Sequence, residues 1–165
     1  MPKLLTSRRL FLSILGLALS SCGFRLAGTA SLPHGLSNIY LVTSGFSERQ
    51  RDALRERLSR AGAQVTMQPA AGAAQLSVAM TVIPDRRLVS SARTGKTVDR
   101  LTRSLSFSLK DADGNPLAPG KILTQQKDIA LDDDNLLAST QEKNAVIREL
   151  ENTLFNQLIR QLERI

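Results

Sequence analysis

Two stretches, QLSVAMTV (residues 75–82) and LTRSLSFSL (residues 101–109), indicate the architecture of this chain most clearly. Apolar and polar side chains alternate in both, and a period of two is expected of strands that bury one face. Thr94-Gly95-Lys96 lies between them as a turn signal. The pattern therefore predicts two antiparallel strands joined by a tight loop.

The segments before these strands predict a strand and a helix. Ile39-Tyr40-Leu41-Val42 is a short apolar, strand-prone run. Ser47 with Gln50 three residues later has the spacing of a capping box, and Gly62 is expected to end the helix. A short strand is indicated at Val65, but the loop-like residues 69–72 follow at once.

The segments after the two strands predict another strand and a long helix. Asp113-Gly114-Asn115-Pro116 is a turn signal that leads into a one-sided strand over residues 121–131. Ser139 or Thr140 is the expected N-cap of the last helix. Its apolar face recurs at helical spacing in Ile147, Leu150, Leu154, Leu158, Leu162 and Ile165. Pro84 is expected at a sheet edge or a bulge.

The order of elements is thus β-α-β-β-β-α. This order predicts an α+β fold, a two-layer sandwich in which an about four-stranded, mostly antiparallel sheet packs against two helices. Residues 39–165 are expected to form a single domain, because the length and apolar content suit one core.

The first 22 residues have the features of a bacterial lipoprotein export signal. Lys3, Arg8 and Arg9 precede an apolar run, and Leu19-Ser20-Ser21-Cys22 fits a lipobox. We therefore expect residues 1–21 to be a cleaved signal peptide, Cys22 to carry a diacylglycerol and an N-acyl chain such as palmitate, and residues 22–38 to form a tether. The paired arginines leave the choice between general and twin-arginine export open.

The composition of the remaining chain argues against an enzyme, a metal site and a cofactor site. Without residues 1–21 the chain has 19 Lys and Arg (22 minus 3) against 15 Asp and Glu, a net charge of +4. No cysteine follows Cys22, and His34, the one histidine, lies in the expected tether. Structural zinc sites and a Ser-His-Asp triad are therefore not expected. The acidic run at residues 132–134 lacks the alternating ligands of a calcium loop.

A basic cluster on the predicted central hairpin has two interpretations. Arginine forks and a mobile lysine suit an anionic headgroup, and the same charges equally suit a soluble hairpin with protected edges. The chain is expected to be exported, so nucleic acid is not an expected partner. The cluster consists of Arg86, Arg87, Arg93, Lys96, Arg100 and Arg103.

The chain also resembles the lipopolysaccharide-assembly lipoproteins of the LptE (RlpB) family. The resemblance rests on CGFRLAG after the lipobox, on Leu32-Pro33 with the strand that follows, on Arg93-Thr94-Gly95-Lys96-Thr97 in the hairpin, and on QLIRQL in the last helix. It implies a non-enzymatic, lipid-anchored protein of the outer membrane, which Gly23 after the cysteine also favours. The implied partner is the β-barrel LptD, with this chain on the periplasmic side and in the barrel lumen as a plug.

The resemblance further implies a role in lipopolysaccharide transport and insertion at the outer leaflet. Its candidate lipopolysaccharide-binding residues in this chain are Arg93, Lys96 and Arg148. Two other interpretations remain: an auxiliary lipoprotein of a lipid-trafficking ABC transporter, and an envelope hydrolase, against which the missing catalytic residue types argue.

Overall fold

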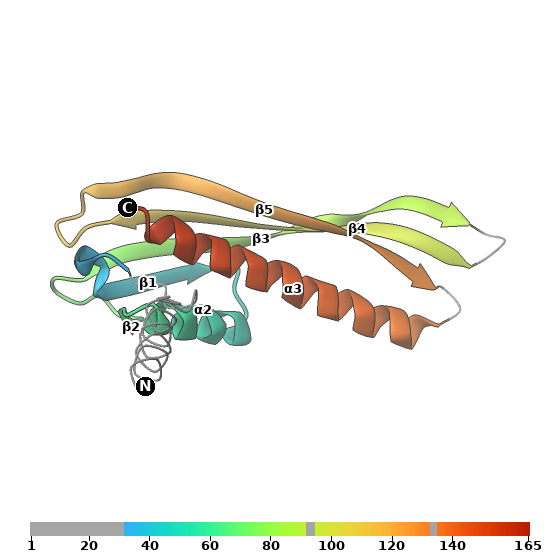
Figure 1. Cartoon of the computed structure of the whole chain (residues 1–165), viewed down its shortest axis with the longest axis horizontal. Coiled ribbons are helices and arrows are strands. Elements are labelled where there is room, and N and C mark those ends of the chain that lie inside the picture. The colour runs from blue at the N-terminus through green and yellow to red at the C-terminus, as the bar shows by residue number, and fades with distance from the viewer. Residues whose placement is uncertain (1–31, 92–94, 133–134) are drawn as a thin grey trace, which may run out of the picture.

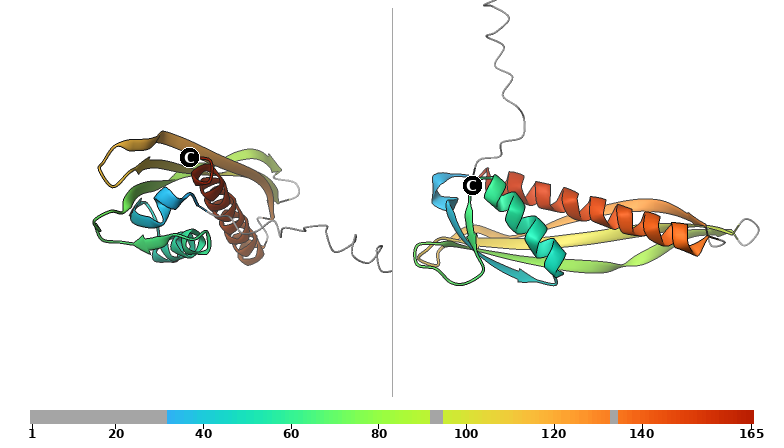
Figure 2. Two further views of the ribbon diagram at one scale, coloured as in Figure 1. Left: turned by 60° about the vertical axis from the view of Figure 1, so that its left-hand side comes forward. Right: turned by 90° about the horizontal axis from the view of Figure 1, so that it is seen from below.

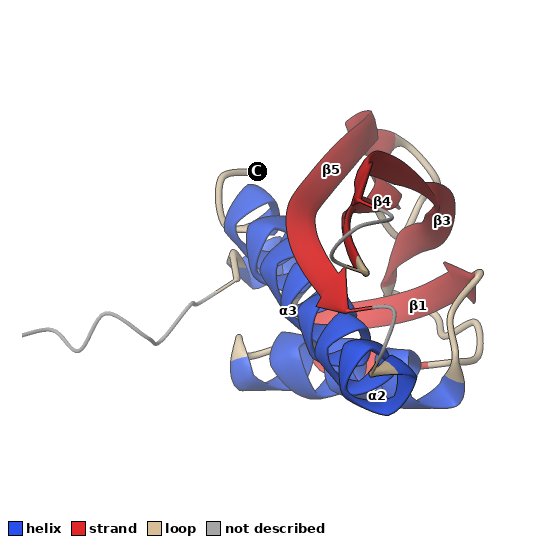
Figure 3. Cartoon of the chain, turned by 90° about the vertical axis from the view of Figure 1, so that its right-hand side faces the viewer, coloured by secondary structure: helices blue, strands red, loops and turns tan. Residues whose placement is uncertain are grey.

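One mixed sheet of five strands forms the centre of the computed structural model, which describes residues 32–91, 95–132 and 135–165. The sheet order is β2-β1-β3-β4-β5. Two helices, α2 (Glu48–Arg60) and α3 (Leu136–Leu162), lie on one face of the sheet (Figures 1 and 3). The strands are β1 (Asn38–Ser44), β2 (Gln64–Thr66), β3 (Ala74–Ser91), β4 (Lys96–Lys110) and β5 (Pro116–Asp132).

The predicted α+β sandwich with two helices is confirmed, and the sheet has one strand more than expected. The extra strand is β2, which forms at the short stretch indicated by Val65. The long pairs β3–β4 and β4–β5 are antiparallel, as predicted, but β1 is parallel to both β2 and β3. The reason is that α2 is a crossover: it returns the chain to the end of the sheet where β1 began, which makes the next strand parallel.

Helix α2 begins and ends where the sequence predicts. The Ser47 backbone N–H donates to Gln50 Oε1 at 2.7 Å, and the Gln50 backbone N–H donates to Ser47 Oγ at 3.4 Å, so the capping box is complete. After the helix, Gly62 has a φ of 95°, a left-handed value that glycine adopts without strain. The face of α2 toward the sheet is apolar, since Leu54, Leu58 and Ala61 are buried.

Helix α3 begins four residues earlier than predicted. Its N-cap is Asn135, whose Oδ1 accepts from the Ala138 N–H at 3.2 Å, so the prediction of Ser139 or Thr140 is wrong. The Ser139 hydroxyl is used elsewhere: it donates to the carbonyl of Asp132 at 2.8 Å and accepts from the N–H of the same residue at 3.0 Å. These bonds fix the start of α3 to the end of β5.

The hydrophobic core lies between the sheet and the helices and is unevenly distributed. The larger buried cluster joins β1, β3 and β4 to α2 and to the C-terminal part of α3. A second cluster of Leu101, Ile129, Val146 and Leu150 joins β4 and β5 to the middle of α3. The predicted stripe of α3 supplies both clusters, except that Ile165 lies beyond the helix and is exposed.

Three strands extend well beyond the rest of the sheet. β1 pairs with β3 only as far as Ser44 with Ala79, whereas β3 continues to Ser91. From Thr81 onward, β3 is therefore an edge strand, and its register with β4 shifts between Ile83 and Arg86, as expected near Pro84. We call residues 81–91, 95–104, 124–132 and 135–150 the distal half, and the other described residues the proximal half.

The described end of the predicted tether is packed against the proximal half. Residues His34–Leu36 form a 3-10 turn, and Leu36 is buried in the larger cluster. The Leu32 N–H donates to the carbonyl of Ala61 at 3.0 Å. The predicted signal peptide and Cys22 lie outside the described residues. Among the helices that are described, none has the length and apolarity needed to span a membrane.

Candidate functional site

The sequence-predicted site residues do not come together in one place. Arg93 lies outside the described residues. Lys96 is the first residue of β4, at the tip of the distal half, and its side chain is exposed. Arg148 is exposed on α3, 12 residues after Leu136, which places it about 18 Å along the helix from its start. The distal tip and the Arg148 region are therefore two separate candidate surfaces.

Two arginines of the predicted basic cluster are neutralised by carboxylates on neighbouring strands. Arg87 Nε lies 3.2 Å from Asp99 Oδ1. Arg100 makes a two-pronged contact with Asp128, at 2.7 Å and 2.9 Å. The hydrogen bond from Arg100 lowers the pKa of Asp128 below its usual value. The Arg100–Asp128 pair is exposed and contributes little to stability, and both pairs leave little net charge for a ligand.

A third arginine of the cluster is buried beneath α3. Arg103 is only 6% exposed, because it lies on the helix-covered face of β4. Its Nη1 donates to the carbonyl of Thr102 at 2.7 Å and lies 3.6 Å from Asp85 Oδ1. The other oxygen of Asp85 lies 2.5 Å from Lys143 Nζ on α3. Asp85 thus links β3, β4 and α3.

Two cations of the cluster have no ion pair or hydrogen bond to other residues in the part of the chain that the structure describes: Arg86 and Lys96. Exposed apolar side chains accompany them at this end of the molecule. Leu136 and Leu137, in the first turn of α3, are each 72% exposed, and Leu88 and Val89 near the end of β3 are also exposed. The distal tip thus combines free positive charge with uncovered apolar surface.

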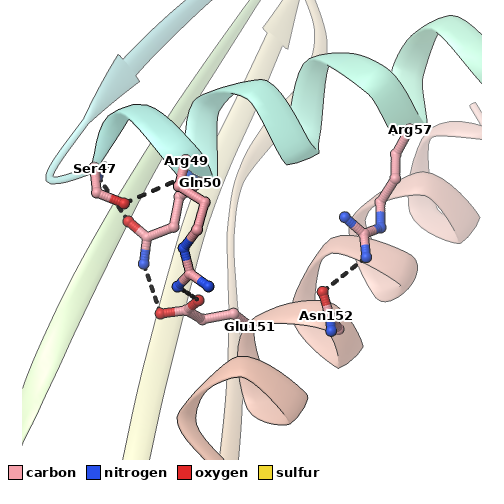
Figure 4. A network of polar contacts seen from close by, with 6 residues as sticks. All are labelled: Ser47, Arg49, Gln50, Arg57, Glu151 and Asn152. Carbon is pink, nitrogen blue, oxygen red and sulfur yellow. Dashed lines mark hydrogen bonds and ion pairs between the residues drawn. The ribbon is translucent and has the colours of Figure 1, made fainter. Parts of the chain in front are cut away.

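The second candidate surface is built around a buried carboxylate between α2 and α3 (Figure 4). Glu151 is only 6% exposed. Its Oε1 accepts from Gln50 Nε2 at 2.6 Å, and its Oε2 lies 3.5 Å from Arg49 Nη2. Gln50 also completes the capping box of α2. The start of α2 and its contact with α3 therefore depend on the same side chain.

Arg57 makes the second polar contact between the two helices. Its Nη2 donates to Asn152 Oδ1 at 2.7 Å, and its guanidinium lies 5.5 Å from the centroid of the Phe155 ring. The Phe155 ring in turn stacks on Phe46. Partial burial lowers the pKa of Arg57 from its usual value. On the exposed side of α2, Arg60 Nη2 lies 3.5 Å from Glu56 Oε1, one helical turn earlier.

A crevice of about 90 Å³ lies beside this network. It is lined by Arg49, Gln50, Arg148, Glu151, Asn152 and Phe155. Arg148 makes no hydrogen bond or ion pair with any other described residue. The crevice therefore carries one guanidinium that none of the described residues neutralises.

No described helix covers the sheet face opposite α2 and α3 over the proximal half (Figure 1). A shallow depression of about 250 Å³ is lined mainly by small side chains, among them Ser77, Ala79, Ser106 and Ser108. They are the polar members of the alternating pattern, and no helix covers them. The depression is also lined by Val42, Val78 and Phe107.

Asp85 and Glu151 are the residues that sequence reasoning missed. Glu151 follows Leu150 directly and borders the apolar stripe of α3, and a charged residue at such a position signals a buried partner. Asp85 follows Pro84, and nothing in its local pattern indicates that it contacts residues 18 and 58 positions further along the chain.

The fold and these surfaces define an elongated, two-layer α+β domain that presents charged and apolar surface at one end. The sequence matches the LptE family, described as lipopolysaccharide-assembly, over residues 36–162. The chain therefore belongs to the LptE family. Among curated proteins, the sequence has no match.

Solved structures of lipoproteins have a similar fold. A minor lipoprotein from Acinetobacter baumannii is 20% identical, with a TM-score of 0.63 over 80% of this chain and 94% of that one. Lipoprotein B from Nitrosomonas europaea is 19% identical, with a TM-score of 0.63 over 86% and 90%. The rare lipoprotein B from Shewanella oneidensis is 16% identical, with a TM-score of 0.60 over 76% and 92%.

Proposed function

We propose that this protein is a non-enzymatic lipoprotein of the outer membrane that forms a complex with an LptD-type β-barrel. In this role it is the plug and assembly partner of the barrel, and it assists lipopolysaccharide transport and insertion at the outer leaflet. The observation that carries the proposal is the family match over residues 36–162. A lipid anchor on Cys22 places the domain at the periplasmic side, from which it enters the lumen.

The shape and surface of the domain support this proposal. The lumen of an outer-membrane barrel is polar. The uncovered sheet face, with its serines and its absence of ion pairs over the proximal half, suits contact with such a wall. The long distal half gives the domain the extension needed to reach along a barrel.

The candidate lipopolysaccharide site in this proposal is the distal tip. Lys96 and Arg86 supply free positive charge there, Arg93 belongs to the same hairpin in sequence, and Leu136 and Leu137 supply apolar surface for acyl chains. Arg148 lies on α3 away from the tip, so we propose it for a separate surface.

Purification of the tagged, lipidated protein from outer membranes tests the proposed complex. We expect a large β-barrel in equal amount, and we expect Cys22→Ser to release the protein from the membrane fraction. Recovery of ABC-transporter subunits instead of a barrel would favour the auxiliary-lipoprotein alternative, and an unchanged membrane fraction for the variant would exclude the anchor.

Titration of the purified domain with lipopolysaccharide tests the site. Charge-assisted hydrogen bonds contribute about 1.5–3 kcal/mol each, so replacing Arg93 and Lys96 together by Asp is expected to weaken binding at least about tenfold. Lys110→Asp is the matched control, because Lys110 is the exposed last residue of β4 as Lys96 is the exposed first. Equal affinities for both variants would reject the tip as the site.

A further inference from the structure

The crevice between α2 and α3 opens where the two helices separate. Seen from the helix side (Figure 2, right), the helices lie close together near their C-terminal ends and diverge toward their N-terminal ends. The crevice is small, with a volume of about 90 Å³, and its size suits a single side-chain group. Phe155 forms its apolar part, and Arg49 and Arg148 supply its positive charge.

The hydrogen-bonding groups left free in this crevice are donors. Both oxygens of Glu151 are used, one by Gln50 and one by Arg49. The side-chain oxygen of Asn152 is used by Arg57. The guanidinium of Arg148, the remaining N–H groups of Arg49 and the amide N–H groups of Asn152 are left to donate. Two arginines against one glutamate give the crevice a net charge of +1.

The exposed surface of α3 continues from this crevice toward the distal tip. Leu137 precedes Arg148 by 11 residues, which is about three helical turns, so the two side chains lie on the same side of α3 about 16 Å apart. Leu137 is 72% exposed. Helix α2, which covers this side of α3 further on, begins only at Glu48 and does not reach Leu137. This strip of α3 is open to a partner.

We propose that the crevice receives an acidic side chain of a polypeptide partner, and that the same partner segment covers Leu137. The proposal rests on the proposed function, in which the partner is the β-barrel. A carboxylate with one negative charge fits the free donors and the small volume. A phosphate is larger than a carboxylate, so the carboxylate is the acidic group that better fits a crevice of about 90 Å³.

Charge reversal in the lipidated, full-length protein tests this assignment. Arg148→Glu is compared with Arg160→Glu, an exposed arginine near the end of the same helix. We expect Arg148→Glu to weaken binding to the purified barrel in detergent on the order of tenfold, because it removes a charge-assisted contact and adds repulsion. Arg160→Glu is expected to bind like the wild type. Unchanged circular dichroism verifies that both variants fold.

A photo-crosslinking residue at position 148 identifies what enters the crevice. We expect a crosslink to a barrel segment that contains Asp or Glu, and replacing that acidic residue by Lys is expected to restore binding of Arg148→Glu. A barrel that binds wild type and Arg148→Glu equally would overturn the assignment and leave the proposed function intact. Loss of lipopolysaccharide affinity in Arg148→Glu with unchanged barrel binding would overturn it in favour of a phosphate. A wild type that captures no barrel would reject the proposed function itself.

Discussion

The proximal and distal halves of this molecule are held together in different ways. In the proximal half, both helices pack on the sheet and the buried cluster is large and apolar. In the distal half, only α3 covers the strands, the buried cluster has four members among the described residues, and ion pairs such as Asp85 with Arg103 and Lys143 complete the contact. Stability is therefore concentrated in the proximal half, while the free charge and the exposed apolar side chains of the tip lie in the distal half.

Truncating one core leucine in each half gives the largest expected effect. Leu154 and Leu101 are both fully buried, in the larger and the smaller cluster. We expect Leu154→Ala to lower the free energy of unfolding by about 4 kcal/mol and Leu101→Ala by about 2 kcal/mol, because a small, one-sided cluster collapses more readily around a cavity. Urea unfolding followed by circular dichroism measures both. Equal losses would mean that the distal cluster is as rigid as the proximal one.

Removal of the carboxylate that links the distal elements is expected to have an intermediate effect. Asp85→Asn leaves the buried Arg103 and Lys143 without a counter-charge, at a cost of about 2 kcal/mol. The loss of amide hydrogen-exchange protection should be confined to the distal strands and the first turns of α3. Asp128→Asn is the control, because the Arg100–Asp128 pair is exposed and contributes little. Loss of protection in β1 and α2 as well would show that the halves unfold together.

The smallest expected effect is a pH dependence carried by two surface carboxylates, one in each half. Hydrogen bonds, first from the Asn115 side chain and then from its backbone N–H, lower the pKa of Asp111 in the proximal β4–β5 turn, and the hydrogen bond from Arg100 lowers that of Asp128. A lowered pKa in the folded state means that the stabilisation is complete above the unfolded value of 3.8 and is lost as the pH falls through the folded value.

The corresponding experiment compares Asp111→Asn and Asp128→Asn with the wild type. The difference in the free energy of unfolding is expected to be largest at about pH 7 and to decrease as the pH falls below the unfolded value of 3.8. If the variants and the wild type still differ in unfolding free energy in acid, the negative charge of the carboxylates is not the cause of the stabilisation.

The sequence predicts those parts of the structure that depend on local patterns. Period-two alternation located β3 and β4, and the Ser47–Gln50 spacing located the start of α2, because both depend on residues close together in the chain. The parallel pairing of β1 could not be predicted in the same way, since it depends on where α2 returns the chain. The N-cap of α3 was missed because three residue types suited to capping occur within six positions, and the tertiary contact of Ser139 with Asp132 decides among them.

The sequence predicts which charged residues occur in the candidate site, but it does not predict which of them form ion pairs. The sequence shows which residues of the hairpin are basic, but only the three-dimensional arrangement shows that Arg87, Arg100 and Arg103 each have a carboxylate. Of the three predicted lipopolysaccharide-binding residues, Lys96 lies at the tip, Arg148 lies on α3 away from it, and Arg93 lies outside the described residues. The position of Arg148 follows from the packing of α2 against α3, which no local pattern encodes.

The free edge of β3 beyond Ala79 has a consequence for self-association. An uncovered strand edge is a template on which another chain can add by hydrogen bonding, and this leads to aggregation. Pro84 has no backbone N–H to offer such a chain, and the register shift beside it interrupts the regular spacing of the remaining groups. Pro84 and the register shift therefore protect this free edge against pairing with the same edge of a second copy of the protein.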